Sequence, residues 1–137
     1  MPGKKDRIVI DTNLWISFLL SKTSSDLDNL LREDKIILLF SEELLEEFIE
    51  VANRPKFKKY FSSTDVTDLI LQVRERGQFI EVTSKVELCR DPKDNFLLSL
   101  CKDGKATHLI TGDKDLLALI KLARTKITTL KSFVSNN

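Results

Sequence analysis

The sequence predicts an α/β domain of three layers, α/β/α, with a central parallel sheet of about five strands. Short apolar runs of the strand type alternate along the chain with longer segments of helical periodicity. This alternation is typical of parallel sheets whose right-handed crossovers place helices on both faces. The chain has 137 residues, of which 42% are hydrophobic, which suits one domain with one packed core. We therefore expect residues 1–137 to form a single domain.

The elements follow from short apolar runs and from helical spacing. The predicted strands are residues 7–10, 36–40, 79–82, 108–111 and 127–130. These runs are apolar and bounded by turn residues, as strands of a buried sheet are. The predicted helices begin at Leu14, Ser41, Thr64, Asp91 and Asp113, and the last extends to about Arg124.

Capping residues and helix breakers fix several of the predicted ends. Ser41 is expected to cap the second helix, whose acidic first turn suits the positive end of the helix dipole. Pro55 ends that helix, because proline disfavours an α conformation in the residue before it. Thr64 is expected to cap the third helix and Gly77 to stop it. A polar segment at residues 22–25 is expected to interrupt the first helix.

The net charge of the chain limits how the protein can bind nucleic acid. Charged residues make up 31% of the chain but leave a formal net charge of only +1. Contact with nucleic acid must therefore use local basic patches, because overall charge provides no steering. Two patches are visible, for which solvated lysines that keep the protein soluble are the alternative interpretation. The patches are Arg54-Pro55-Lys56-Phe57-Lys58-Lys59 and, near the C-terminus, Lys121, Arg124, Lys126 and Lys131.

The two cysteines do not indicate a metal site. Cys89 and Cys101 lack CxxC spacing and a cluster of histidines, so zinc binding is not expected. We expect free thiols in a reducing compartment. The first residues lack the apolar stretch of a signal peptide, and no apolar run has the length of a membrane span. The sequence therefore predicts a cytoplasmic protein.

Four acidic residues stand where apolar runs meet turn residues, in segments far apart in the chain. They are Asp11, Glu47, Asp94 and Asp113. Three of them follow or adjoin a predicted strand end, which is where open α/β sheets place ligand sites. Carboxylates that converge there repel one another unless a cation neutralises them, and Mg²⁺ prefers oxygen ligands. The pattern predicts metal-dependent phosphate chemistry.

Each acid also has an ordinary structural explanation. Asp94 can close a helix cap, Asp113 can cap the next helix, and Asp11 can support the first turn. Glu47 can be one of many solvated glutamates. Glu46 and Glu47 border the apolar stripe of their helix on opposite sides, and periodicity does not choose between them.

Other catalytic systems find less support. His108 begins a predicted buried strand, where core packing is favoured over a catalytic role. The chain shows no Ser/His/Asp or Cys/His system for covalent catalysis, and no P-loop pattern.

Three segments of the chain together resemble the PIN-domain family, and especially its bacterial toxin components of toxin–antitoxin pairs: IVIDTNLWISFLL, SEELLEEFIEVANRPKF and CRDPKDNFLLSLCKDGKATHLITGDKDLL. The resemblance covers roughly residues 7–130. It implies a parallel sheet of 3-2-1-4-5 type order and a PIN-like nuclease domain. The implied activity is hydrolysis of RNA by an endoribonuclease that uses Mg²⁺ or Mn²⁺.

The resemblance also assigns roles to residues. The four acids of the family fall on Asp11, Glu47, Asp94 and Asp113, as catalytic residues that hold one or two metal ions. Asn13 is expected to orient a metal-bound water or one of the acids. Asp91 and Asp115 are acidic neighbours of lower rank.

The implied partners are an RNA substrate, an antitoxin protein and a second copy of the chain. Lys56, Lys58 and Lys59 would contact the RNA backbone. Two alternatives stay open. A phosphoacceptor receiver domain should carry an acidic pair after its first strand, where this chain has Asp11-Thr12-Asn13. An inactive module with the PIN fold would bind RNA or protein without cutting it.

Overall fold

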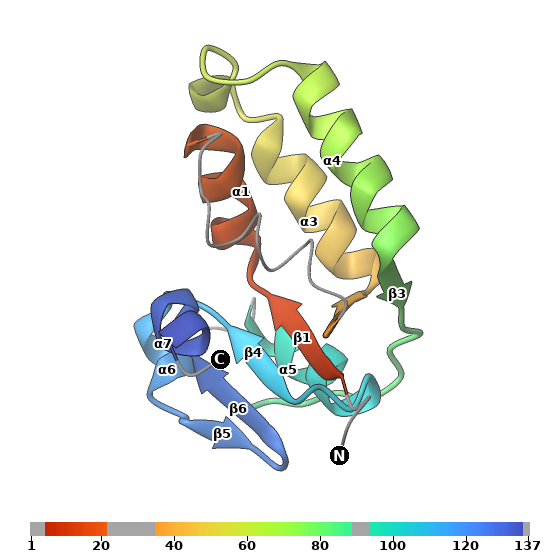
Figure 1. The fold of residues 1–137 in the computed structure, drawn as a ribbon, viewed down its shortest axis with the longest axis vertical. Helices are drawn as coiled ribbons and strands as arrows, with labels where there is room; N and C mark the ends of the chain where they lie inside the picture. The colour runs from red at the N-terminus through yellow and green to blue at the C-terminus, as the bar shows by residue number, and fades with distance from the viewer. Residues whose placement is uncertain (1–4, 22–34, 89–93, 136–137) are drawn as a thin grey trace.

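The computed structural model describes residues 5–21, 35–88 and 94–135 (Figure 1). Its strands are β1 (Asp6–Ile10), β2 (Ile36–Phe40), β3 (Gly77–Phe79), β4 (His108–Ile110), β5 (Lys121–Leu122) and β6 (Thr125–Thr128). Its helices are α1 (Thr12–Ser21), α3 (Glu42–Ala52), α4 (Ser63–Arg76), α5 (Asn95–Asp103), α6 (Lys114–Leu117) and α7 (Leu130–Ser135), with a 3-10 turn η1 (Pro55–Phe57). Within these residues no helix is both long and apolar enough to cross a membrane.

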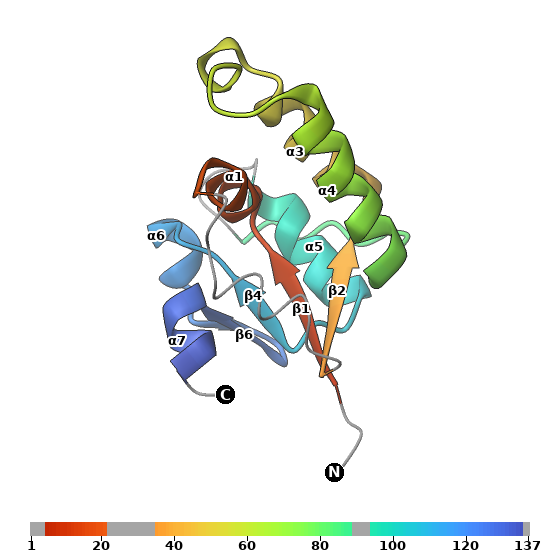
Figure 2. The same cartoon turned by 45° about the horizontal axis from the view of Figure 1, so that its top comes forward.

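A six-stranded sheet forms the centre, in the order β3-β2-β1-β4-β6-β5. All neighbours pair in parallel except β5, which adds an antiparallel edge beside β6. Helices flank the sheet: α5 lies behind β1 and β4 in Figure 1, whereas α1 and α3 stand beyond the end of β1 in both views (Figures 1 and 2). α4 contacts β2 and β3. The predicted fold class is confirmed, and the order agrees with 3-2-1-4-5 when β6 is counted as the fifth strand.

β1 occupies the middle of the sheet because its apolar residues are buried on both faces. Ile8 pairs in register with Leu38 of β2, and Ile10 pairs with Ile110 of β4. Continuous apolar runs are typical of strands covered on both sides. The strand ends at Ile10, so the next residue, Asp11, emerges at the carboxyl edge, where its N–H donates to the Ile110 carbonyl at 3.0 Å.

Trp15 fixes the start of α1 against the end of β1. Its side chain is 1% exposed, and its indole Nε1–H donates to the Ile10 carbonyl at 3.1 Å. Its ring lies 5.4 Å from the ring of Phe40, at the end of β2. A buried indole that has a hydrogen-bond partner adds apolar contact without an unsatisfied donor. The packing of Trp15 against Phe40 therefore stabilises the turn that carries Asp11.

The ends of α3 agree with the sequence prediction. Ser41 is its N-cap, and the Ser41 hydroxyl accepts a hydrogen bond from the Leu44 N–H at 3.1 Å. The helix ends at Ala52, and Pro55 begins η1 three residues later.

The predicted cap of α4 is wrong by two residues. Ser62, not Thr64, is the N-cap: its hydroxyl accepts from the Asp65 N–H, and the Asp65 carboxylate accepts from the Ser62 N–H. An acidic residue three positions after a hydroxyl makes such a reciprocal cap, and only Ser62 has one. Gly77 does end the helix, and its N–H donates to the Val73 carbonyl. A Cβ at this position would lie 2.6 Å from the same oxygen, so a larger residue would not fit without a shift.

The third strand also lies earlier than predicted. It spans Gly77–Phe79 instead of residues 79–82. Its partner β2 ends at Phe40, which pairs with Phe79. The Ile80 N–H still donates to the Phe40 carbonyl at 2.8 Å, but beyond it β2 offers no further backbone to pair.

The C-terminal quarter differs most from the prediction. The helix expected over residues 113–124 is only α6, four residues long, and it is followed by the β5–β6 hairpin. Ile120 and Ala123 have positive φ angles of 64° and 52°, which no helix accommodates. The predicted strand 127–130 is β6 at Thr125–Thr128, and α7 was not predicted. The predicted interruption at residues 22–25 and the helix start at Asp91 lie outside the described residues.

Candidate active site

Asp11 lies at the centre of the candidate site, at the carboxyl ends of the neighbouring strands β1 and β4. Its side chain is buried, with 6% of the residue exposed. The Thr111 hydroxyl donates to Asp11 Oδ2 at 2.7 Å, and the Asn13 N–H approaches Asp11 Oδ1 at 3.4 Å. The sequence predicted that the strand is buried, and the structure shows that the Asp11 carboxylate after it is buried as well.

The surroundings of Asp11 favour its neutral form. Burial raises the pKa of Asp11 above its usual value, and the negative charge of Asp113 raises it further. The hydrogen bond from Thr111 opposes the shift by stabilising the carboxylate. A buried acid beside a second acid is the electrostatic situation that a bound cation relieves.

Asp113 is joined to Asp11 through Thr111. The Asp113 N–H donates to the Thr111 hydroxyl oxygen at 3.0 Å, and that hydroxyl donates onward to Asp11. Asp113 also caps α6, where its carboxylate accepts from the Asp115 N–H at 2.8 Å. The capping role and a place at the site therefore coexist in one residue. The side chain of Asp115 is exposed.

Glu47 reaches the same edge from α3. The Thr12 hydroxyl donates to Glu47 Oε2 at 2.6 Å, and Thr12 directly follows Asp11. Glu47 is half-buried, whereas Glu46 is exposed and lines a separate hollow. The structure thus places the two glutamates on different surfaces, a distinction that helical periodicity left open. The two threonines that orient the acids were missed from the sequence because hydroxyl–carboxylate pairs this far apart in the chain leave no local pattern.

Asn13 and Asp94 lie differently from the other site residues. Asn13 is exposed in the first turn of α1. Asp94 is half-buried at the N-cap position of α5, one residue before the helix begins, and its side chain does not cap that helix. Asp91 lies outside the described residues.

The ligand chemistry of these acids fits a hard divalent cation, because carboxylates are the protein ligands that such a cation prefers. Asp11 supports the fit, because it is a buried carboxylate whose charge is opposed by burial and by a neighbouring acid. Within the described part of the chain, however, no three side chains of Asp, Glu, His or Cys come close enough to hold a metal ion. Asp11 is joined to Asp113 through Thr111, and Glu47 accepts a hydrogen bond from Thr12, the residue that follows Asp11.

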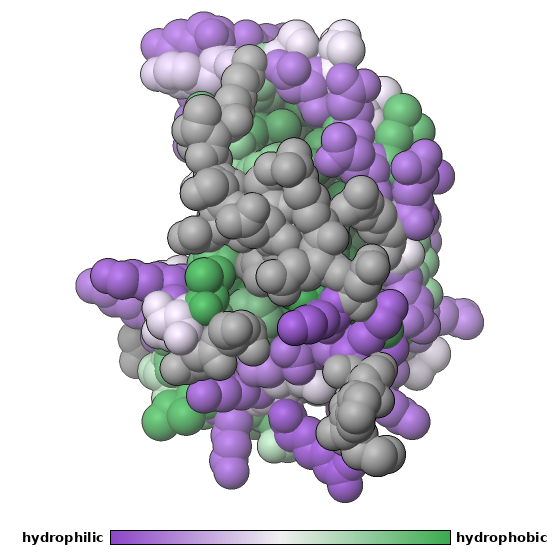
Figure 3. All heavy atoms as spheres, in the orientation of Figure 1, coloured by the Kyte–Doolittle hydropathy of each residue, from purple (hydrophilic) through white to green (hydrophobic). Residues whose placement is uncertain are grey.

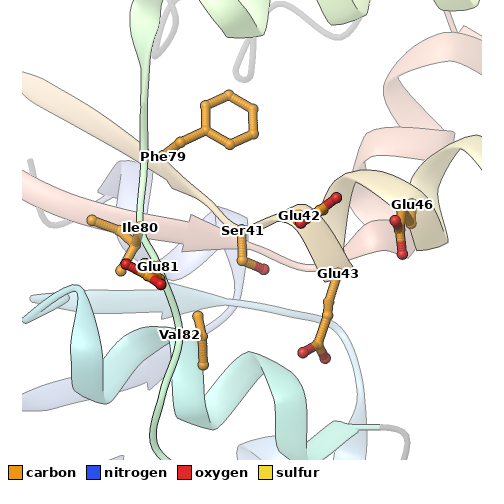
Figure 4. A pocket seen from close by; sticks show the side chains of 8 residues that line it. All are labelled: Ser41, Glu42, Glu43, Glu46, Phe79, Ile80, Glu81 and Val82. Carbon is orange, nitrogen blue, oxygen red and sulfur yellow. The ribbon is translucent and has the colours of Figure 1, made fainter.

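An acidic hollow lies between the first turns of α3 and the segment after β3 (Figure 4). Its volume is about 620 Å³. It is lined by Ser41, Glu42, Glu43, Glu46, Phe79, Ile80, Glu81 and Val82. Figure 4 shows the residues of α3 on one side of it and Phe79 to Val82 on the other. We call this feature the acidic hollow.

The first basic patch lies at the opposite end of α3. Lys56, Lys58 and Lys59 are exposed around η1. The Lys56 ammonium lies 5.0 Å from the centre of the Phe57 ring, and the Lys59 ammonium 5.3 Å from the Tyr60 ring. In Figure 3 the top of the molecule is a mixture of strongly hydrophilic residues and residues of intermediate hydropathy. The second patch falls on the β5–β6 hairpin and α7, where Lys121, Arg124, Lys126 and Lys131 are exposed.

His108 and Cys101 lie away from the acids. His108 begins β4, at the end of the strand remote from Asp113, and its ring packs at 4.8 Å against Phe133. Burial lowers the pKa of His108. Cys101 is a free, buried thiol whose pKa burial raises to about 12. Such a thiol is unreactive. Cys89 lies outside the described residues.

The fold and the site define an α/β protein with a parallel sheet and acidic side chains at the carboxyl ends of its two central strands. A family model described as PIN domain matches residues 7–115, from β1 into α6. The chain belongs to the PIN-domain family. The resemblance inferred from the sequence is thereby confirmed, and the matched segment includes all four predicted acids.

Structural comparison gives the same fold. The chain is similar to VapBC2 from Rickettsia felis, solved bound to a DNA fragment from its promoter, with a TM-score of 0.57. The match covers 88% of this chain and 96% of that chain at 14% sequence identity, a likeness that concerns the fold alone. No curated protein matches this chain.

Proposed function

We propose that this protein is an endoribonuclease that hydrolyses RNA phosphodiester bonds with Mg²⁺ or Mn²⁺. PIN domains are nucleases and generally use divalent metal ions, so hydrolase activity in general follows from the family. The observation that supports this function most is the buried Asp11 carboxylate, joined through Thr111 to Asp113 at the carboxyl edge.

The acids would hold the metal, and the threonines would hold the acids. A bound divalent cation supplies an acidified water and neutralises charge on the phosphate. Asp11, Glu47, Asp94 and Asp113 are the residues proposed to hold it. A carboxylate has about four lone-pair positions, so the bonds that Asp11 accepts from Thr111 and from the Asn13 N–H, and the bond that Glu47 accepts from Thr12, leave positions for a metal ion. The exposed Asn13 amide would orient a water molecule or a phosphate oxygen.

The proposed partners follow from charge and from the comparison. Lys56, Lys58 and Lys59 would bind the phosphates of the RNA substrate, whereas the acidic hollow repels them. The R. felis VapBC2 assembly supports a toxin role for this chain, with an antitoxin protein as its partner. A homodimer and action in the cytoplasm belong to the same proposal.

An inactive PIN-fold binding module is the second candidate. It is favoured by one observation: within the described residues, no three acidic side chains approach to metal-binding distance. A phosphoacceptor receiver has no comparable support, because β1 is followed by Asp11-Thr12-Asn13 and not by an acidic pair.

Cleavage of a panel of structured and unstructured RNAs separates the two candidates. The panel is incubated with Mg²⁺, with Mn²⁺ and with EDTA, using the wild type, Asp11→Asn and Asp94→Asn. We expect metal-dependent cleavage by the wild type and a loss of about two orders of magnitude or more in each variant, because metal-assisted charge stabilisation contributes several kcal/mol. Circular dichroism checks that the variants remain folded. Full activity in both variants, or no cleavage by the wild type, contradicts the proposal.

A further inference from the structure

A second hollow opens at the corner where α3 leads into α4. Its volume is about 400 Å³, within the size range of small-molecule sites. Its floor is apolar and consists of the buried side chains Ala52, Phe61 and Val66. Polar side chains of Asn53, Lys58 and Ser63 complete the lining. We call this feature the corner hollow.

The polar groups of the corner hollow are available to a ligand. Within the described residues, neither the Asn53 amide nor the Ser63 hydroxyl makes a side-chain hydrogen bond. The backbone of Asn53 is nevertheless fixed, because its N–H caps α3 by donating to the Ile49 and Val51 carbonyls. An amide offers two donors and an acceptor. An apolar floor with such a rim matches a planar heterocycle that has apolar faces and a polar edge.

The surface around the corner hollow carries excess positive charge. Lys56 and Lys59 lie beside the Lys58 that lines it, and the described lining residues include no acid. The nearby acids are engaged: the Asp65 carboxylate accepts from the Ser62 N–H, and Glu50 pairs with Arg54 at 3.4 Å. Tyr60 is 54% exposed next to the lysines. Exposed aromatic rings among cations are a common platform for unpaired bases, which stack on them.

The corner hollow and the candidate active site both include residues of α3. Asn53 follows Glu47 by six residues, which corresponds to about 9 Å along α3 at the usual helical rise. Figure 1 shows α3 leading from the carboxyl edge of the sheet to the corner, with α1 beside it. A short single strand that lies along α3 could therefore contact both places.

We propose that the corner hollow binds one unpaired base of the RNA, with the Asn53 amide reading the edge of the base and the lysines holding the adjoining phosphates. The inference deepens the proposed function, because a base held at a fixed distance from Asp11 selects which phosphate reaches the acids. Binding itself requires neither metal nor cleavage. The corner hollow would thus give the enzyme a preference for the base near the scissile bond.

Binding in EDTA tests the inference without relying on catalysis. Short single-stranded A, C, G and U oligomers are titrated into the wild type, Asn53→Ala and Gln72→Ala, with fluorescence anisotropy as the readout. Gln72 is an exposed amide of α4 that does not line the corner hollow, so it is the matched control. We expect the wild type to prefer one base by about tenfold, the discrimination that an amide contact to a base edge provides. Asn53→Ala should lose the preference, while Gln72→Ala keeps it.

The outcomes separate this inference from the proposed function. A protein that binds RNA with base preference but never cleaves it supports the corner hollow and contradicts the nuclease. Metal-dependent cleavage without any base preference supports the nuclease and overturns the corner hollow. Equal effects of Asn53→Ala and Gln72→Ala overturn it as well. So does tighter binding of an acidic peptide than of every RNA, because the lysines would then serve a protein partner.

Discussion

The two ends of α3 present opposite chemistry. The acidic hollow at its first turns is lined by the exposed carboxylates of Glu42, Glu43 and Glu46, while the corner hollow past its last turn adjoins three exposed lysines. The net charge of +1 conceals this separation. A polyanion would be attracted to one end of the helix and repelled from the other, so under the proposed function α3 sets where RNA approaches the protein. Glu47, which reaches the candidate active site, lies between these two ends along α3.

The largest expected effect is a difference in RNA cleavage rate between variants of two adjacent glutamates. Glu47→Gln should reduce RNA cleavage by about two orders of magnitude, since it removes charge from the proposed metal site. Glu46→Gln should change it less than about threefold, because Glu46 lines the acidic hollow. Single-turnover rates with Mn²⁺ measure both. Equal small effects would remove Glu47 from the site, and a reversed ranking would move the site into the acidic hollow.

The basic end should matter for binding more than for chemistry. Replacing Lys56, Lys58 and Lys59 together by alanine should weaken RNA affinity by about tenfold or more at low salt and reduce the salt dependence, because fewer counterions are released. Titrations at several salt concentrations give the slope. Lys121→Ala combined with Lys126→Ala and Lys131→Ala is the matched control on the second patch. An unchanged slope in the first triple variant returns its lysines to a solubilising role.

The acids should make the metal-free protein less stable at neutral pH. The pKa of Asp11 is raised in the folded state, so the folded protein holds this proton more tightly than the unfolded chain does. The resulting contribution to folding stability is fully present below the pKa that Asp11 has in the unfolded chain, and it is lost as the pH rises through the pKa in the folded protein. Asp11→Asn should therefore melt in EDTA at the same temperature as the wild type or a few degrees higher at pH 7, and this advantage should vanish in acid.

Adding metal should reverse the order of the melting temperatures of the wild type and Asp11→Asn. Mn²⁺ at millimolar concentration should raise the melting temperature of the wild type, as ligands that bind only the folded state do, and raise that of Asp11→Asn much less. Asp113→Asn, which keeps a side chain able to cap α6, is the second variant. If the wild type gains nothing from Mn²⁺, the acids do not form a metal site.

The smallest effect concerns the acidic hollow itself. Glu42→Gln with Glu43→Gln should strengthen RNA binding less than threefold, because exposed charges near the path of the RNA are screened by salt. Glu87→Gln, an exposed glutamate outside the acidic hollow, is the control. Weaker RNA binding in the double variant would contradict the repulsion on which the comparison of the two ends rests.

The sequence indicated the elements that depend on local patterns. β1 was recognisable from its continuous apolar run, and the cap at Ser41 from a hydroxyl before an acidic turn. The true cap of α4 was also recognisable, since Ser62 has Asp65 three positions on. The β5–β6 hairpin was not, because Ile120 and Ala123 adopt left-handed conformations that neither residue type favours. The Ile120 carbonyl accepts from the Ile127 N–H at 2.8 Å across the hairpin, a contact that the local sequence does not indicate.

The candidate site was predicted in its acids but not in their connections. Asp11 and Asp113 could be placed at strand ends by their position after apolar runs. The Thr111 hydroxyl between them joins segments 100 residues apart, and no local pattern reports such a bond. The hydrogen bond from Thr12 that distinguishes Glu47 from Glu46 also depends on the packing of α1 against α3 and leaves no local pattern.

Trp15 is the only tryptophan of the chain, and its position makes it an internal optical probe. Its indole is shielded from water and bonded to the carbonyl immediately before Asp11. Its fluorescence should therefore be blue-shifted and poorly quenched by iodide in the folded protein. Any ligand that shifts the turn at Asp11 should alter the emission without an attached dye.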